Sequence, residues 1–244
     1  MENKKITISR IMIFAINACL LYLVGKPFVG SIIYTNSEIS KEWSYAIAEG
    51  ITIALVIIMG AIERKNLVSY GICKGTYKNS LKYILPLGLL ALMIAPYFFG
   101  IPMVDPVVPA VLDVIFIGVM EELIFRGLLF RAAEVLMGEH LAVIISSILF
   151  GLIHLVNLSG NNAVSYVLFQ VVFNAVIGLG FAALRAKTKS ILAGIIIHII
   201  LDMNGIFAAE IQWVENAQII MYFVVGGLLY GFYLAERRKK AQQS

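Results

Sequence analysis

Eight apolar segments, most of them about as long as a membrane-spanning helix, constrain the fold of this chain more than any other feature. A transmembrane helix needs roughly 20 consecutive apolar residues. The segments cover residues 7–25, 44–62, 83–104, 107–130, 141–158, 163–185, 190–208 and 217–235. The chain is 60% apolar and 14% charged, whereas a soluble domain is about 45–50% apolar and about 25% charged. We therefore predict an all-α, polytopic membrane helix bundle of about eight transmembrane helices, with one integral membrane domain over residues 1–244.

The distribution of Lys and Arg predicts the orientation of the bundle in the cell membrane. If the N-terminus is cytoplasmic, all of the 19 Lys and Arg except Lys26 and Lys41 fall on the cytoplasmic side. Cytoplasmic loops are enriched in these residues, so both termini are expected in the cytoplasm. The pI near 9.0 then reflects loops that face an anionic leaflet, and not a nucleic-acid partner. The longest such loop, residues 63–82, would suit a short helix on the membrane surface.

Two glycine-rich stretches predict close contacts between helices. Gly178 and Gly180 lie in the sixth apolar segment, and Gly227 and Gly231 lie in the eighth. Small residues let the backbones of membrane helices approach each other. We expect these glycines inside the bundle, with a dimer contact as the alternative.

Charged residues interrupt the apolar stretch between residues 107 and 137. Glu121, Glu122 and Arg126 lie there, although a charge at the centre of a membrane helix costs roughly 2.5 to 3.5 kcal/mol. Glu122 and Arg126 are four residues apart with the acid first, which favours an ion pair on one helix face. Glu121 is turned about 100° away at 3.6 residues per turn. The ion pair therefore explains Glu122 and leaves Glu121 to find partners on other helices.

Two further segments carry polar residues at membrane depth. His154 lies four residues after Phe150, and Asp202 lies four residues after His198. A spacing of four places each pair on one face of a helix. Ionisable residues inside a membrane tend to mark functional sites. We expect Glu121, His154, His198 and Asp202 to converge from three helices.

This set of side chains suits hydrolysis of a peptide bond by water. A carboxylate beside a His can take a proton from water, and a second His can donate to the developing oxyanion. The same nitrogen and oxygen atoms would also suit zinc. Neither a His-Glu-x-x-His nor a Gly-x-Ser-x-Gly motif is present. An aspartate dyad of Asp113 and Asp202 would lack a supporting glycine motif.

In their order and spacing the residues resemble the CAAX-protease and bacteriocin-processing (CPBP) intramembrane proteases, formerly grouped with abortive-infection proteins. The family pattern is Glu-Glu-x-x-x-Arg, then Phe-x-x-x-His, then His-x-x-x-Asn or Asp, on separate membrane helices. The corresponding residues here, within about 107–207, are Glu121, Glu122, Arg126, Phe150, His154, His198 and Asp202. Each motif alone is weak, but three in order form a specific signal.

The resemblance implies an eight-helix endopeptidase with assigned roles for these residues. Glu121 and His154 would activate water, and His198 with Asp202 would stabilise the oxyanion. Glu122 and Arg126 would support the site. Because an ionised Asp cannot donate to an oxyanion, Asp202 must be protonated or must orient His198. We favour a mechanism without a metal; if zinc binds, its ligands would be Glu121, His154, His198 and Asp202.

Other functions remain open at this point. The expected enzyme would cleave short or membrane-associated peptides, such as a CAAX-type tail, a peptide pheromone or a bacteriocin leader. A non-catalytic immunity or regulatory protein is one alternative, and a proton-coupled transporter with Glu121, His154 and Asp202 as a relay is another. The expected partners are a peptide substrate and the lipid bilayer. The sequence does not indicate an oligomeric state.

Overall fold

The chain is a bundle of helices. The computed structural model describes residues 2–62, 67–78, 80–94, 105–160, 162–203, 206 and 212–243, and contains no β-strand within them. Its elements are α1 (Glu2–Leu20), η1 (Leu21–Gly25), α2 (Lys26–Asn36), α3 (Lys41–Ile62), α4 (Leu81–Ile94), α5 (Val107–Glu121), η4 (Glu122–Leu129), α6 (Phe130–Met137), α7 (Glu139–Ile153), η5 (His154–Gly160), α8 (Val164–Thr188), α9 (Leu192–Asp202) and α11 (Gln212–Ala241). The predicted all-α membrane bundle is confirmed.

Within the described residues, five helical stretches are long and apolar enough to cross a membrane. They are Ser9–Asn36, Lys41–Gly60, Glu139–Leu158, Val164–Thr188 and Ile219–Ala241. The shorter apolar helices Leu81–Leu90 and Leu192–Asp202 belong to the predicted third and seventh spans. The remainder of those two spans falls partly outside the described residues. The predicted fourth span continues through α5, η4 and α6 without a break.

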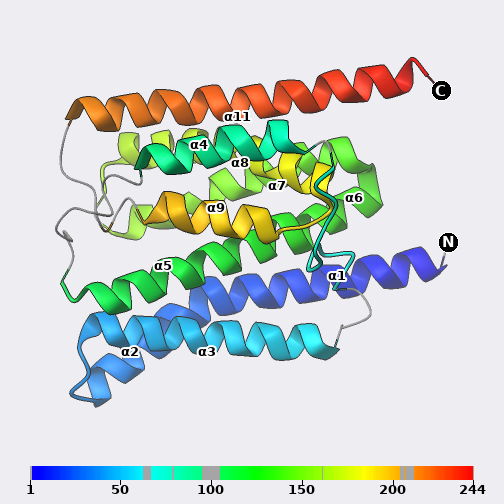
Figure 1. The fold of residues 1–244 in the computed structure, drawn as a ribbon. Helices are drawn as coiled ribbons and strands as arrows, with labels where there is room; N and C mark the ends of the chain where they lie inside the picture. The colour runs from blue at the N-terminus through cyan, green and yellow to red at the C-terminus, as the bar shows by residue number, and fades with distance from the viewer. Residues whose placement is uncertain are drawn as a thin grey trace.

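The long helical runs lie side by side (Figure 1), and α1 with α2, like α5 with α6, forms one continuous run. The beginning of α1 and the end of α11 lie at the same end of the bundle. The loop of residues 67–78 and α6 are also at that end. We refer to it below as the terminal end. An even number of membrane spans, such as the eight predicted segments, would place both termini on one side of the membrane.

The first helical run is longer than predicted and includes Lys26. The sequence suggested a span over 7–25 with Lys26 outside it, but η1 and α2 continue the helix to Asn36. Lys26 Nζ lies 2.7 Å from Glu49 Oε2 and 3.0 Å from Asp113 Oδ1. Because both carboxylates come from other helices, they neutralise Lys26 inside the bundle.

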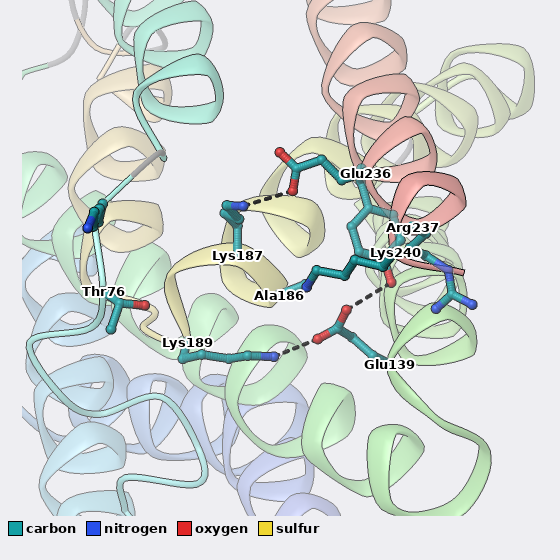
Figure 2. A pocket seen from close by; sticks show the side chains of 10 residues that line it. Thr76, Glu139, Ala186, Lys187, Lys189, Glu236, Arg237 and Lys240 are labelled. Atoms are coloured by element: carbon teal, nitrogen blue, oxygen red, sulfur yellow. Dashed lines mark hydrogen bonds and ion pairs between the residues drawn. The ribbon is translucent and has the colours of Figure 1, made fainter. Parts of the chain in front are cut away.

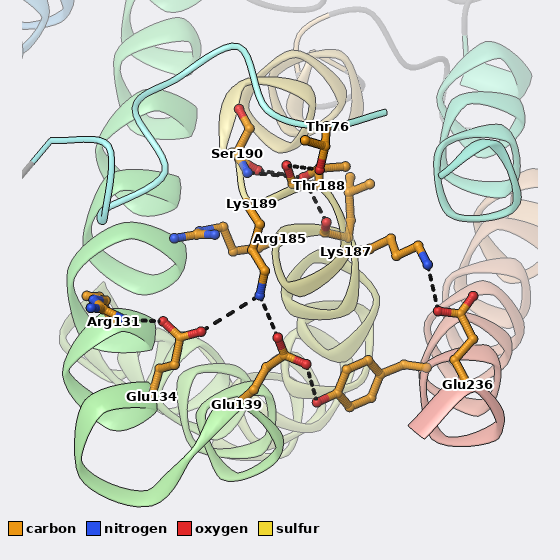
Figure 3. Close-up of polar contacts among 12 residues, drawn as sticks. Thr76, Arg131, Glu134, Glu139, Arg185, Lys187, Thr188, Lys189, Ser190 and Glu236 are labelled. Carbon is orange, nitrogen blue, oxygen red and sulfur yellow. Dashed lines mark hydrogen bonds and ion pairs between the residues drawn. The ribbon is translucent and has the colours of Figure 1, made fainter. Parts of the chain in front are cut away.

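The loop of residues 67–78 lies against the connection between α8 and α9, and its described residues form no helix. The expected surface helix is therefore wrong for this part of the chain. Hydrogen bonds to its backbone hold the loop instead. The Thr76 N–H donates to the Thr188 carbonyl at 2.7 Å, and the Ser190 hydroxyl donates to the Cys73 carbonyl at 2.6 Å. Figure 3 shows Thr76, Thr188 and Ser190 together beside Arg185. These bonds satisfy polar backbone that would otherwise be left without partners.

Glycines allow α7, α8 and α11 to approach closely. A Cβ at Gly178 would lie 3.2 Å from the Phe150 ring, and one at Gly180 would lie 3.1 Å from Leu229. The prediction of close packing is confirmed for these two residues. It is wrong for Gly227 and Gly231, where a Cβ would meet no atom within 4 Å.

Candidate active site

The first motif lies at a change in helical winding. The α-helix α5 ends at Glu121, and the next eight residues form the π-helix η4. The sequence argument assumed 3.6 residues per turn throughout, so the local winding differs from the expectation. π-Helical segments are rare and are frequent at functional sites. Arg185 on α8 binds this segment directly, since its Nε donates to the Arg126 carbonyl at 3.2 Å.

Glu122 and Arg126 form the expected ion pair, with Arg126 Nη1 3.1 Å from Glu122 Oε1. Both side chains are almost completely buried. Among the described residues, the Arg126 guanidinium has no partner in good hydrogen-bond geometry. Its Cζ instead lies 3.9 Å from the ring centroid of Phe150 and 5.2 Å from that of Phe181. Charge attraction to Glu122 and cation–π contacts therefore hold Arg126 in place.

His198 on α9 joins the first motif to the third. Its Nδ1 lies 3.1 Å from Glu122 Oε1. Its Nε2 lies 3.4 Å from Asp202 Oδ2 and 3.6 Å from Glu121 Oε2. Because an ionised carboxylate only accepts hydrogen bonds, Nδ1 is the donor to Glu122. At the opposite edge of the ring, Nε2 faces two carboxylates, and three acceptors there would repel each other. A proton on Nε2, or on one of the two carboxyl groups, relieves this repulsion.

Tyr22 on η1 is a partner of Glu121 that the sequence argument missed. Its hydroxyl donates to Glu121 Oε1 at 2.9 Å. Oε1 of Glu121 is therefore held by Tyr22, and Oε2 faces His198. Glu121 is only 8% exposed. No local signal identifies Tyr22, because tyrosines in apolar segments are commonly interface anchors.

Phe150 links the second motif to the other two, because its ring contacts residues of all three. Its ring packs edge-to-face against His154 at 5.5 Å and against His198 at 5.7 Å between centroids. His154 lies where α7 ends and the 3₁₀-helix η5 begins, and its Nδ1 is 3.0 Å from the Phe150 carbonyl. A carbonyl only accepts, so Nδ1 carries the proton, and in the neutral ring Nε2 has a free lone pair. No direct hydrogen bond between His154 and Glu121 is found in the described part of the chain.

A small cavity adjoins the third motif. It has a volume of about 60 Å³, which is enough for more than one water molecule. The residues that line it are Phe150, Phe173, Asn174, Ile177, Phe181, His198, Leu201, Asp202 and Tyr222. Five of these residues are apolar, and Asn174, His198, Asp202 and Tyr222 are the polar ones. The sequence argument did not identify Asn174, whose amide nitrogen donates to the Gln170 carbonyl at 2.9 Å.

Three of the four candidate zinc ligands, Glu121, His198 and Asp202, lie close together. Glu121 and Asp202 both face His198 Nε2, at 3.6 Å and 3.4 Å. Within the described ranges, no group of three or more His, Cys, Asp or Glu residues is placed to hold a metal ion. A mechanism without a metal stays a prediction, and it is developed below as a proposal.

Comparison with known proteins identifies the segment that carries all three motifs. Residues 103–204 match the family described as type II CAAX prenyl endopeptidase Rce1-like. The match begins before α5 and ends just after Asp202. Comparisons with curated proteins and with solved structures found no match. Residues 103–204 are thus similar to the Rce1-like type II CAAX prenyl endopeptidases, and the resemblance to the CPBP family that the three motifs indicated is confirmed.

Proposed function

We propose that this chain is an intramembrane endopeptidase that hydrolyses a peptide bond with water activated by Glu121 and His154. One observation carries the proposal above the others. The His198 ring lies between Glu121, Glu122 and Asp202, with Glu121 and Asp202 facing the same nitrogen. Glu121, Glu122 and His198 are buried, and buried ionisable groups inside an apolar bundle are costly to maintain, which favours a functional role.

The first step is attack of water on the scissile carbonyl carbon. Tyr22 holds Oε1 of Glu121, which leaves Oε2 to accept a proton from the water. His154 presents the lone pair of Nε2, since its Nδ1 donates to the Phe150 carbonyl. It can therefore accept a hydrogen bond from the same water and orient it. As the C–O bond forms, the carbonyl oxygen becomes an oxyanion.

The second step stabilises and then resolves the tetrahedral intermediate. The proton shared by His198 Nε2 and Asp202 is the donor available to the oxyanion. Glu122 holds the opposite ring nitrogen of His198, and so fixes the ring. The proton on Glu121 then passes to the amide nitrogen, the C–N bond breaks, and a carboxyl group and an amine are released.

We also propose that the terminal end of the bundle faces the cytoplasm. This end carries Arg131, Arg185, Lys187, Lys189 and the basic end of α11 (Figure 3). The positive-inside tendency supports this orientation. The family similarity supports a substrate at the membrane, such as a prenylated CAAX-type tail, and an unprenylated peptide substrate is the alternative that the test below separates.

The three histidines of the chain provide the test. We propose to measure cleavage of one CAAX-type peptide, with and without its prenyl group, by the purified protein and by His154→Gln, His198→Gln and His140→Gln. His140 packs against Tyr230 and Tyr233 at the terminal end and is the matched control. We expect a rate loss of about 10²–10⁴-fold for His154→Gln and His198→Gln, and near wild-type cleavage for His140→Gln. Undiminished cleavage by His154→Gln or His198→Gln would contradict the assigned roles.

A further inference from the structure

A basic pocket of about 510 Å³ lies at the terminal end of the bundle, apart from the candidate active site (Figure 2). It is formed by the ends of α8 and α11, the start of α7 and the loop of residues 67–78. Five cationic side chains line it: Lys78, Lys187, Lys189, Arg237 and Lys240. None of these residues belongs to the three motifs, and the proposed hydrolysis does not use them.

The two carboxylates of the pocket are already occupied by other partners. Glu236 pairs with Lys187 at 2.8 Å and also with Lys82. Glu139 pairs with Lys189 at 2.5 Å, and accepts a hydrogen bond from Tyr233 at 3.2 Å. Figure 2 shows the pairs Lys187–Glu236 and Lys189–Glu139 at the pocket wall. The acidic residues therefore cannot neutralise the remaining cations.

Three cations of the pocket are left without a carboxylate partner among the described residues. They are Lys78 from the loop, and Arg237 and Lys240 from successive turns of α11. The Arg237 guanidinium lies over the Tyr233 ring, with its Cζ 5.9 Å from the ring centroid. Lysine and arginine side chains gathered around a hollow attract an anion with several oxygen atoms, and a phosphate group has this chemistry.

A second hollow extends the pocket onto an apolar surface. It is lined by Leu81, Lys82 and Leu85 of α4, and it shares Lys187 and Glu236 with the basic pocket. Leu81 is 67% exposed and Leu85 is 50% exposed. A free phosphate would contact only the basic pocket. A molecule with an anionic headgroup and hydrocarbon chains would contact both hollows.

We propose that this pocket binds the phosphate of an anionic phospholipid, with the acyl chains lying along Leu81 and Leu85 of α4. Basic pockets between membrane helices on the cytoplasmic side are suited to such headgroups. The pocket lies at the end where the Lys and Arg of the chain gather, so an anionic leaflet would supply the ligand. One bound headgroup would then contact the loop of residues 67–78, α8 and α11 at once.

Two double variants of α11 test the proposal. Arg237→Gln with Lys240→Gln removes two pocket cations, and Arg238→Gln with Lys239→Gln removes two cations of the same helix that do not line the pocket. Both variants lose the same charge from adjacent exposed positions. The full chain, purified in a neutral detergent, would be melted over a concentration series of dioctanoyl phosphatidylglycerol. Parallel series would use dioctanoyl phosphatidylcholine and sodium phosphate at matched ionic strength.

We expect the anionic lipid to raise the melting temperature of the wild type, since a ligand that binds only the folded state stabilises it. The zwitterionic lipid and inorganic phosphate should have little effect. The pocket variant should bind phosphatidylglycerol about 10- to 30-fold more weakly, and the control variant should resemble the wild type. Lys78→Gln, on the loop, should weaken binding several-fold without any change in α11.

Three results would overturn the proposal. Equal loss in both double variants would mean that general surface charge, and not the pocket, attracts the lipid. Stabilisation by inorganic phosphate equal to that by phosphatidylglycerol would assign the site to a free anion. Absence of any shift with phosphatidylglycerol would show that no such site exists. Melting of each variant without ligand shows that it is folded.

Discussion

The Tyr22 hydroxyl donates a 2.9 Å hydrogen bond to Oε1 of Glu121, which lies 99 positions later in the chain. This bond joins the first helical run to the carboxylate proposed as the general base. Tyr22 lies outside residues 103–204, the segment that matches the Rce1-like family. The N-terminal part of the chain therefore contributes to the geometry of the candidate site.

Removal of the Tyr22 hydroxyl should reduce the rate without unfolding the protein. A hydrogen bond to a charged group contributes about 1.5–3 kcal/mol. If Tyr22 orients Glu121, Tyr22→Phe should lower kcat by roughly tenfold or more with little change in KM, while the protein stays folded with a melting temperature lower by several degrees. Tyr34→Phe, at an exposed position on α2, is the matched control. A wild-type kcat for Tyr22→Phe would mean that the bond has no role in positioning the base.

Loss of Glu122 should destabilise the fold because Arg126 would stay buried without its counter-charge. Breaking a buried ion pair costs about 3–5 kcal/mol, and Arg126 is completely buried. We therefore expect a large drop in melting temperature for Glu122→Gln, and partial recovery when Arg126→Met is added. Both proteins should cleave slowly, because Glu122 also binds His198 Nδ1. A double variant that is less stable than Glu122→Gln would show that the pair is not the main role of Glu122.

Replacing either of two adjacent glycines on α11 with alanine should change the melting temperature in different ways. A Cβ at Gly226 would lie 2.4 Å from the Val176 carbonyl oxygen of α8, whereas a Cβ at Gly227 would meet nothing within 4 Å. Gly226→Ala should force α8 and α11 apart and cost about 1–3 kcal/mol or more. Gly227→Ala should be neutral, or stabilising by up to about 1 kcal/mol. Thermal melting of the two variants in the same detergent compares them, and equal melting temperatures would contradict the packing of α8 on α11.

Activity should survive strong chelation of metals. Glu121 and His154 are proposed to supply the base and the water contact from the protein itself. The measurement is the cleavage rate before and after exhaustive treatment with a chelator. Loss of activity that stoichiometric zinc restores would contradict the mechanism, and Glu121, His154, His198 and Asp202 would then be tested as ligands by metal content.

The sequence was sufficient to predict features that depend on neighbouring residues. Hydrophobic segment length predicted the helices, and a spacing of four residues predicted the Glu122–Arg126 pair, which the structure contains. The three motifs also predicted the family resemblance, which the match over residues 103–204 confirmed. In each case the signal lies within one helix, or in the order of short motifs.

Features that depend on contacts between distant helices were not predictable in this way. Lys26 was assigned to a loop because counting cations cannot show that Glu49 and Asp113 neutralise it inside the bundle. The bond from Tyr22 to Glu121 has no local pattern. The π-helix after Glu121 was also not predicted, and Arg185 on α8 donates a hydrogen bond to its backbone.

The central claim is that Glu121 acts as the base, and the cleavage rate of Glu121→Gln tests it most directly. The substitution keeps the size of the side chain and leaves an oxygen to accept the Tyr22 hydrogen bond. We predict a melting temperature close to that of the wild type, and a rate reduced by at least about 10²–10⁴-fold on the same preparation. Wild-type cleavage by folded Glu121→Gln would contradict the account.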